Sequence, residues 1–158
     1  MHDLTSVSND LLSVINSFYA KHKNLPNELA SINLDSDKWS LKEIIGHLID
    51  SASNNHQRFV RLQIEETLNF PSYHYSWIEI EKFNSVEFKD LITLWKHFNV
   101  LLAHLIRIAD ESALKNVWEA QDQVISLENL MVDYLRHLKE HLNHFEQRLQ
   151  ELESSIRS

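Results

Sequence analysis

Three histidines at helical spacing near the end of the sequence suggest metal chemistry. His137, His141 and His144 lie in the run DYLRHLKEHLNHF. Two imidazoles at positions i and i+4 of a helix can bind one divalent cation. At 100° per residue, a helix places all three along one edge of its apolar face, with His141 closest to the centre of that face. The pair His137 and His141 is therefore a candidate metal site.

A fourth histidine borders another apolar helical face earlier in the chain. His47 is followed, at steps of four, three and four residues, by polar residues that end at Arg58. These residues form a polar edge on the helix. If this helix and the last helix are neighbours, the two polar edges meet, and His47 joins His137 and His141. Three neutral imidazoles suit zinc, nickel, iron or manganese and leave coordination positions open for water or a substrate.

The same histidines also have a structural interpretation. A single histidine at a helix boundary, such as His47, is more often a hydrogen-bonded residue than a ligand. Other site chemistries are excluded, because the chain has no cysteine for a nucleophile or thiolate ligand and only Gly46 for a phosphate loop. The remaining histidines are interpreted as solvated or structural: His2, His22, His56, His74, His97 and His104.

Four long segments have apolar residues at the three- and four-residue spacing of amphipathic helices, and these segments must position the histidines. Ser40 and Glu43 form a capping-box pattern at the start of the second segment. Ser85 is expected to cap the third helix and Ser126 the fourth. The predicted helices cover about residues 4–23, 41–66, 86–108 and 127–153.

This pattern predicts an all-α fold, a four-helix bundle that forms one domain over residues 1–158. The long links between the helices permit a crossover topology instead of a simple up-and-down series. Residues 67–84 are expected to form a loop with a short helical turn near Trp77. Residues 115–125 have a partly alternating pattern that fits an extended segment.

Charge and hydropathy limit the possible partners. The net charge is −8, and the acidic residues are spread along the chain, so a nucleic acid is not expected as a partner. No basic stretch precedes an apolar run at the start, and no segment approaches the ~18 uninterrupted apolar residues of a membrane span. The protein is therefore expected to be cytoplasmic, without a membrane partner.

Four runs of the sequence resemble the DinB-like (DinB/YfiT) superfamily over nearly the full length: WSLKEIIGHLIDSASNNHQRFVR, FPSYHYSW, LITLWKHFNVLL and DYLRHLKEHLNHF. The resemblance implies a four-helix bundle with a divalent metal held by one histidine of the second helix and two of the last. At those positions this sequence has His47, His137 and His141. Glu140 stands where many relatives have a second adjacent histidine. His144 stands where they often have glutamine, and is an alternative ligand or a group that supports the ligands.

The resemblance also implies a metal-dependent enzyme with a small-molecule substrate. Members of the superfamily include thiol S-transferases that use low-molecular-weight thiols such as bacillithiol or mycothiol, and others look like metal-dependent hydrolases. We therefore predict that a thiol or water, activated by the metal, attacks a small electrophilic molecule. The alternative is a non-catalytic helical bundle whose histidines bind metal weakly or serve stability or dimerisation. A homodimer through the outer face of the bundle is also expected, because relatives often pair.

Overall fold

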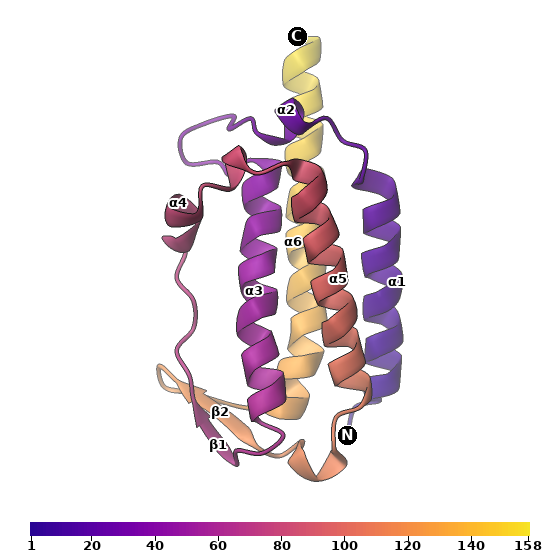
Figure 1. Cartoon of the computed structure of the whole chain (residues 1–158), viewed down its shortest axis with the longest axis vertical. Helices are drawn as coiled ribbons and strands as arrows, with labels where there is room; N and C mark the ends of the chain where they lie inside the picture. Colours follow the sequence, from indigo (N-terminus) through magenta and orange to yellow (C-terminus); the bar gives the residue numbers. More distant parts are fainter.

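The four predicted helices are all present. A computed structural model describes all 158 residues and shows four long helices with a small sheet at one end of the bundle (Figure 1). Helices α1 and α3 each pack against both α5 and α6. The predicted four-helix bundle is therefore confirmed. The long helices are α1 (Leu4–His22), α3 (Leu41–Arg61), α5 (Phe88–Arg107) and α6 (Leu127–Arg157).

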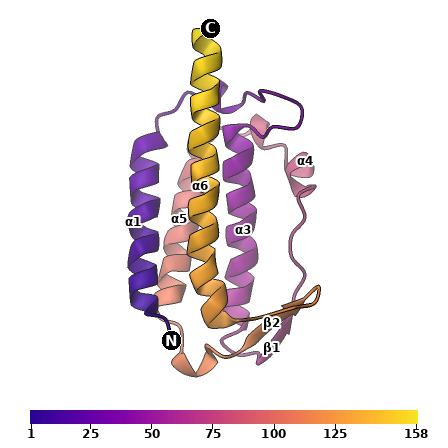
Figure 2. The same ribbon diagram turned by 180° about the vertical axis from the view of Figure 1, so that it is seen from behind.

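The helices do not follow a simple up-and-down order. In Figure 1, α1 and α6 run upward from the sheet end, whereas α3 and α5 run downward, and Figure 2 shows the same order from behind. The long helices α1 and α3 follow each other in the sequence but lie at opposite corners of the bundle, and the same is true of α5 and α6. The links therefore cross the ends of the bundle or run along its side, as the predicted crossover topology requires. Two of them carry short helices, α2 (Asn27–Ala30) and α4 (Trp77–Glu81).

The small sheet joins two distant parts of the chain. It consists of β1 (Thr67–Asn69), β2 (Val117–Ala120) and β3 (Gln123–Ser126), with β1 parallel and β3 antiparallel to β2. The extended segment predicted at residues 115–125 is confirmed. The prediction of a loop at residues 67–69 was wrong, because a three-residue strand with one buried side chain has too short a pattern to detect.

We predicted that this helix would end near residue 66, but α3 ends at Arg61. The sheet explains the difference. The chain has to turn before it can pair with β2. Val117 N donates to Glu66 O at 2.9 Å at the start of this pairing. Asn116 Nδ2 donates to Leu62 O at 2.6 Å, which supplies a partner to a carbonyl at the helix end. From the sheet end, residues 62–87 return along the outside of α3 to the other end of the bundle (Figure 1).

Two of the three predicted helix caps are present. Ser40 and Glu43 form the reciprocal capping box of α3, and the Ser126 side chain caps α6 by accepting from Asn129 N at 3.2 Å. The prediction for Ser85 was wrong, since its hydroxyl donates to Lys82 O at 2.7 Å inside a separate turn of 3-10 helix. Instead, the Asn27 side chain accepts from Phe88 N at 2.9 Å. A cap supplied by a distant segment leaves no local sequence pattern.

Close packing brings the long link against α3. Phe83 is buried directly over Gly46, and a Cβ at position 46 would overlap its ring. Glycine is therefore required at this point of the helix for the link to approach so closely. None of the helices combines the length and the apolar composition needed to cross a membrane.

Candidate functional site

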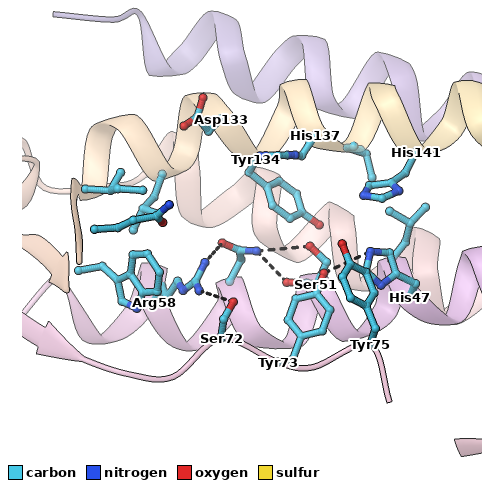
Figure 3. A pocket seen from close by; sticks show the side chains of 17 residues that line it. His47, Ser51, Arg58, Ser72, Tyr73, Tyr75, Asp133, Tyr134, His137 and His141 are labelled. Carbon is cyan, nitrogen blue, oxygen red and sulfur yellow. Dashed lines mark hydrogen bonds between the residues drawn. The ribbon is translucent and has the colours of Figure 1, made fainter. Parts of the chain in front are cut away.

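A cavity of about 260 Å³ lies between α3 and α6. Residues 72–75 of the long link and side chains of β2 and β3 complete its walls, so four separate parts of the chain form it. His47, His137 and His141 all line this cavity (Figure 3). The candidate ligands therefore share one cavity, although the sequence separates His47 from the other two by about 90 residues.

His47 and His141 face each other across the interface of α3 and α6. Their ring centroids are 4.7 Å apart, and the rings meet edge to face at 63°. His47 is only 2% exposed. Tyr75 stacks on its ring with centroids 5.5 Å apart, and Trp39 lies 4.9 Å away on another side. Tyr75 of the link and Trp39, which precedes α3, thus shield the His47 imidazole from water.

The surroundings of both imidazoles favour the neutral form, because they lower the pKa of each ring. Burial, followed by the charges of His141 and His144, lowers the pKa of His47 from 6.5 to about 4. Burial is also the main reason for the lowered pKa of His141, with His137 and His144 adding to it and Glu140 opposing it. A neutral imidazole keeps a nitrogen lone pair that can bind a metal ion. The environment therefore favours the protonation state that ligation needs.

His137 lies one turn before His141 on α6 and points differently. Its side chain is 57% exposed, and its Nδ1 lies 3.7 Å from Glu140 Oε2. Its Nε2 lies 3.2 Å from an Arg136 guanidinium nitrogen. No group of three or more histidine, aspartate or glutamate side chains is gathered as a metal site. The structure thus brings His47 and His141 together and leaves the His137 ring at the mouth of the same cavity.

His144, the alternative ligand, lies beside a cation. Its Nε2 is 3.3 Å from Arg148 Nη2, and the same guanidinium donates to the Trp39 carbonyl. Burial and then the Arg148 charge lower the pKa of His144. His144 does not line the cavity. In this arrangement it supports the packing of α6 behind the pair and does not face the cavity.

The donor chemistry at this end of the cavity fits a divalent metal. His47 Nδ1 is buried without a hydrogen-bond partner, which is costly for a polar atom unless something else binds there. His47 Nε2 lies 3.4 Å from the Tyr73 hydroxyl. The His137 side chain is 57% exposed, so core packing does not fix its rotamer. Imidazole nitrogens without carboxylate partners are ligands that zinc, nickel and iron accept.

Several cavity residues were not found from the sequence. Tyr73 and Tyr75 contact His47 from the link, and Trp118 of β2 lies over the Arg58 guanidinium at the other end of the cavity. The only sequence signal was that residues 70–77 hold more aromatic side chains than a solvated linker needs. Trp118 lies in a segment too short and polar to show which way its side chain points. Arg58 appeared only as a member of the polar edge of its helix.

Comparison with known proteins supports the fold. The sequence matches no protein-family model and no curated protein. Among solved structures, it is similar to YfiT from Bacillus subtilis, with a TM-score of 0.82 and 19% sequence identity. The match covers 94% of this chain and 87% of YfiT. YfiT is described as a probable metal-dependent hydrolase with an unusual four-helix bundle topology. The chain therefore has the YfiT, or DinB-like, fold that the resemblance in the sequence implies.

Proposed function

We propose that this protein is a metal-dependent enzyme in which His47, His137 and His141 hold a divalent metal: zinc, nickel, iron or manganese. The observation that carries the proposal is the contact between the buried His47 and the half-buried His141, whose rings face each other at 4.7 Å in a cavity. The similarity of the fold to a probable metal-dependent hydrolase supports it. A metal at this position would supply a Lewis acid and lower the pKa of a nucleophile.

The residues of the chain have separate tasks in this proposal. His47 and His141 present lone pairs from two different helices, so the interface of α3 and α6 fixes their separation. Tyr73 lies beside His47 Nε2, and its hydroxyl is available to donate a hydrogen bond to a ligand in the cavity. Tyr75, stacked on the His47 ring, keeps the imidazole oriented and excludes bulk water from it.

The substrate in this proposal is a small electrophilic molecule, attacked by a thiol or by water. A cavity of about 260 Å³ is near the lower end of the range for small-molecule sites, which agrees with a substrate of modest size. A low-molecular-weight thiol is the proposed nucleophile if the protein is a transferase, and water if it is a hydrolase. Turnover assays with and without added thiol separate the two reactions.

Elemental analysis of protein purified without a histidine tag is the direct test. We expect about one divalent metal per chain in the native protein and almost none in His47→Ala or His141→Ala, with helicity by circular dichroism unchanged in both. The matched control is His97→Ala, which removes an exposed histidine of α5 away from the cavity and should keep the metal. Native protein that binds no metal from a stoichiometric supply would contradict the proposal and favour a non-catalytic bundle.

We also propose that the protein works in the cytoplasm as a homodimer. Three exposed apolar side chains follow one another at seven-residue spacing along the outer side of α5, and such a row suits a helix-to-helix contact between two copies. They are Leu94, Leu101 and Ile108. Light scattering should give twice the chain mass for the native protein and a monomer for Leu101→Lys, and a monomeric native protein at high concentration would contradict the proposal.

A further inference from the structure

The cavity has a second end, which lies about three helical turns from the histidines. Arg58 follows His47 by eleven residues on α3, a rise of about 16 Å along the helix axis. Figure 3 shows Arg58 and Ser72 toward one end of the cavity and His47 with His141 at the other. A ligand that reaches both ends would place one group near the imidazoles and another near the guanidinium.

Arg58 is a buried cation without an anion. Its residue is 8% exposed, and none of the ion pairs in the structure includes it. Asp133, the only carboxylate that lines the cavity, is paired with Arg136 at 3.5 Å. A buried charge is costly unless it is paired, so an arginine kept in this state indicates that a charged partner arrives from outside.

The guanidinium is held in place by weak contacts and retains a free donor. Nη1 lies 3.5 Å from Asn55 Oδ1 and Nη2 lies 3.3 Å from Ser72 Oγ, both at the long end of the hydrogen-bond range. Arg58 Nε is buried and has no hydrogen-bond partner. The Trp118 ring lies 4.0 Å from the guanidinium carbon and fixes the plane of the group. A planar, oriented guanidinium whose Nη1 and Nη2 make only long contacts can offer two parallel N–H donors to the two oxygens of a carboxylate.

We propose that Arg58 binds the carboxylate of a small-molecule ligand whose other end reaches the histidine pair. This inference rests on the proposed function only for the role of the histidine pair as a metal site, and not for the binding of the carboxylate by Arg58. A carboxylate fits better than a phosphate group, because Arg58 is the only lysine or arginine lining the cavity and a second negative charge would remain unpaired. Burial lowers the pKa of Arg58 to about 10, so the group stays charged at neutral pH.

The test uses metal-free protein, so that it does not depend on the histidine site. The chelator is removed by gel filtration before titration, because chelators carry carboxylates themselves. Hexanoate is titrated while the indole N–H signal of Trp118 is followed by NMR, with hexanamide as the uncharged control and inorganic phosphate as the competing anion. We expect hexanoate to bind at least about tenfold more tightly than hexanamide, as a charge-assisted hydrogen bond requires. We also expect phosphate to bind more weakly than hexanoate.

Two variants of Arg58 and one control assign the binding to this residue. Arg58→Gln should abolish the preference for hexanoate, whereas Arg61→Gln, which removes a guanidinium outside the cavity on the same helix, should not change it. Arg58→Lys keeps the charge in the buried site but loses the planar pair of donors, so hexanoate affinity should fall about tenfold. This variant tests the inference even if Arg58→Gln does not fold.

Three results would overturn the inference: equal affinity for hexanamide, hexanoate affinity unchanged in Arg58→Lys, or tighter binding of phosphate. Metal analysis of the native protein is a separate measurement. Failure of the anion site and failure of the metal site are therefore distinguished.

Discussion

Two buried histidines of this protein are equally hidden from solvent and differ in what surrounds them. His22 and His47 are each 2% exposed. His22 Nε2 lies 2.6 Å from Glu146 Oε1, so that α1 is tied to α6 by a paired imidazole. His47 has no carboxylate partner, its Nδ1 has no hydrogen bond, and it faces His141. Burial alone therefore does not distinguish the two histidines, whereas the buried nitrogen without a partner is found only in the proposed ligand His47.

Buried polar atoms without a hydrogen-bond partner are concentrated on α3. Outside α3, Trp95 Nε1 on α5 is the one buried side-chain nitrogen or oxygen without a partner, and other buried groups are paired, as where Ser8 Oγ on α1 donates to the Ala103 carbonyl of α5 at 2.7 Å. Unpaired buried polar atoms reduce stability, and proteins keep them mainly where function needs them. Of the five buried side-chain atoms without a partner, one is Trp95 Nε1 and four belong to α3: His47 Nδ1, Asp50 Oδ2, Asn54 Nδ2 and Arg58 Nε.

The sharpest test of this comparison is to remove each histidine in turn and measure metal affinity. His47→Ala should weaken metal binding by two orders of magnitude or more, because a lost ligand is hard to replace. His22→Ala should leave metal binding unchanged, since its ring packs between Phe18 and Phe145 on the other side of α6. Competition with a fluorescent chelator measures both affinities. Equal losses in the two variants would remove the distinction between the histidines.

Stability should respond to the two changes in the opposite order. We expect His22→Ala to lower the free energy of unfolding by about 3 kcal/mol, because it creates a cavity between two phenylalanines and removes the hydrogen bond to Glu146. His47→Ala in metal-free protein should cost only about 1 kcal/mol, since it also removes an unsatisfied nitrogen. Urea denaturation followed by circular dichroism measures both values, and a larger loss for His47→Ala would contradict the comparison.

Part of the pH dependence of stability should come from His47, the proposed ligand. The pKa of His47 is about 4 in the folded protein and about 6.5 when unfolded, so the unfolded chain takes up this proton first as the pH falls. Metal-free protein should therefore lose roughly 2 kcal/mol between pH 6.5 and pH 4 through this residue, and should regain it as the pH rises. His47→Asn should remove this part of the slope. Urea denaturation of the native protein and of His47→Asn at several pH values between 4 and 6.5 measures this difference in slope.

An effect of the opposite sign is expected from the buried carboxyl group on α3. Burial, together with the nearby Glu81, raises the pKa of Asp50 to about 8. Between pH 4 and pH 8 the unfolded chain therefore loses this proton before the folded protein does, and stability decreases as the pH rises. Asp50→Asn should remove this decrease, so that the variant gains roughly 3 kcal/mol relative to the native protein between pH 5 and pH 8. The control Asp10→Asn changes an exposed carboxylate of α1 and should be neutral at both pH values.

The fold was largely predictable because its signals are local. The capping box of Ser40 and Glu43, the Ser126 cap and the apolar periodicity of the long helices all lie within a few neighbouring residues. The predictions were wrong where contacts with a distant segment of the chain determine the local structure. Asn27 caps α5 from across the fold, so the local candidate Ser85 was chosen wrongly.

The site was predictable in part, for the same reason. The HxxxH spacing of His137 and His141 is local, and the prediction that all three histidines bind metal stays a prediction. Helical spacing fixed which side of α6 these residues occupy, but not the rotamer of His137, which depends on Arg136 and Glu140. The stacking of Tyr75 on His47 and of Trp118 on Arg58 joins segments that only the folded chain brings together, so no spacing rule could indicate it.

The order of the helices along the chain has a consequence for biosynthesis. Helix α6 has 31 residues and packs against both α1 and α3, yet the ribosome makes it after the other three long helices. At about 5–20 residues per second, the apolar faces of α1 and α3 wait several seconds for their partner. Neither the bundle core nor the cavity can close before α6 has left the exit tunnel. Nascent chains of this fold should therefore depend on chaperones that cover helical apolar faces until α6 has left the exit tunnel.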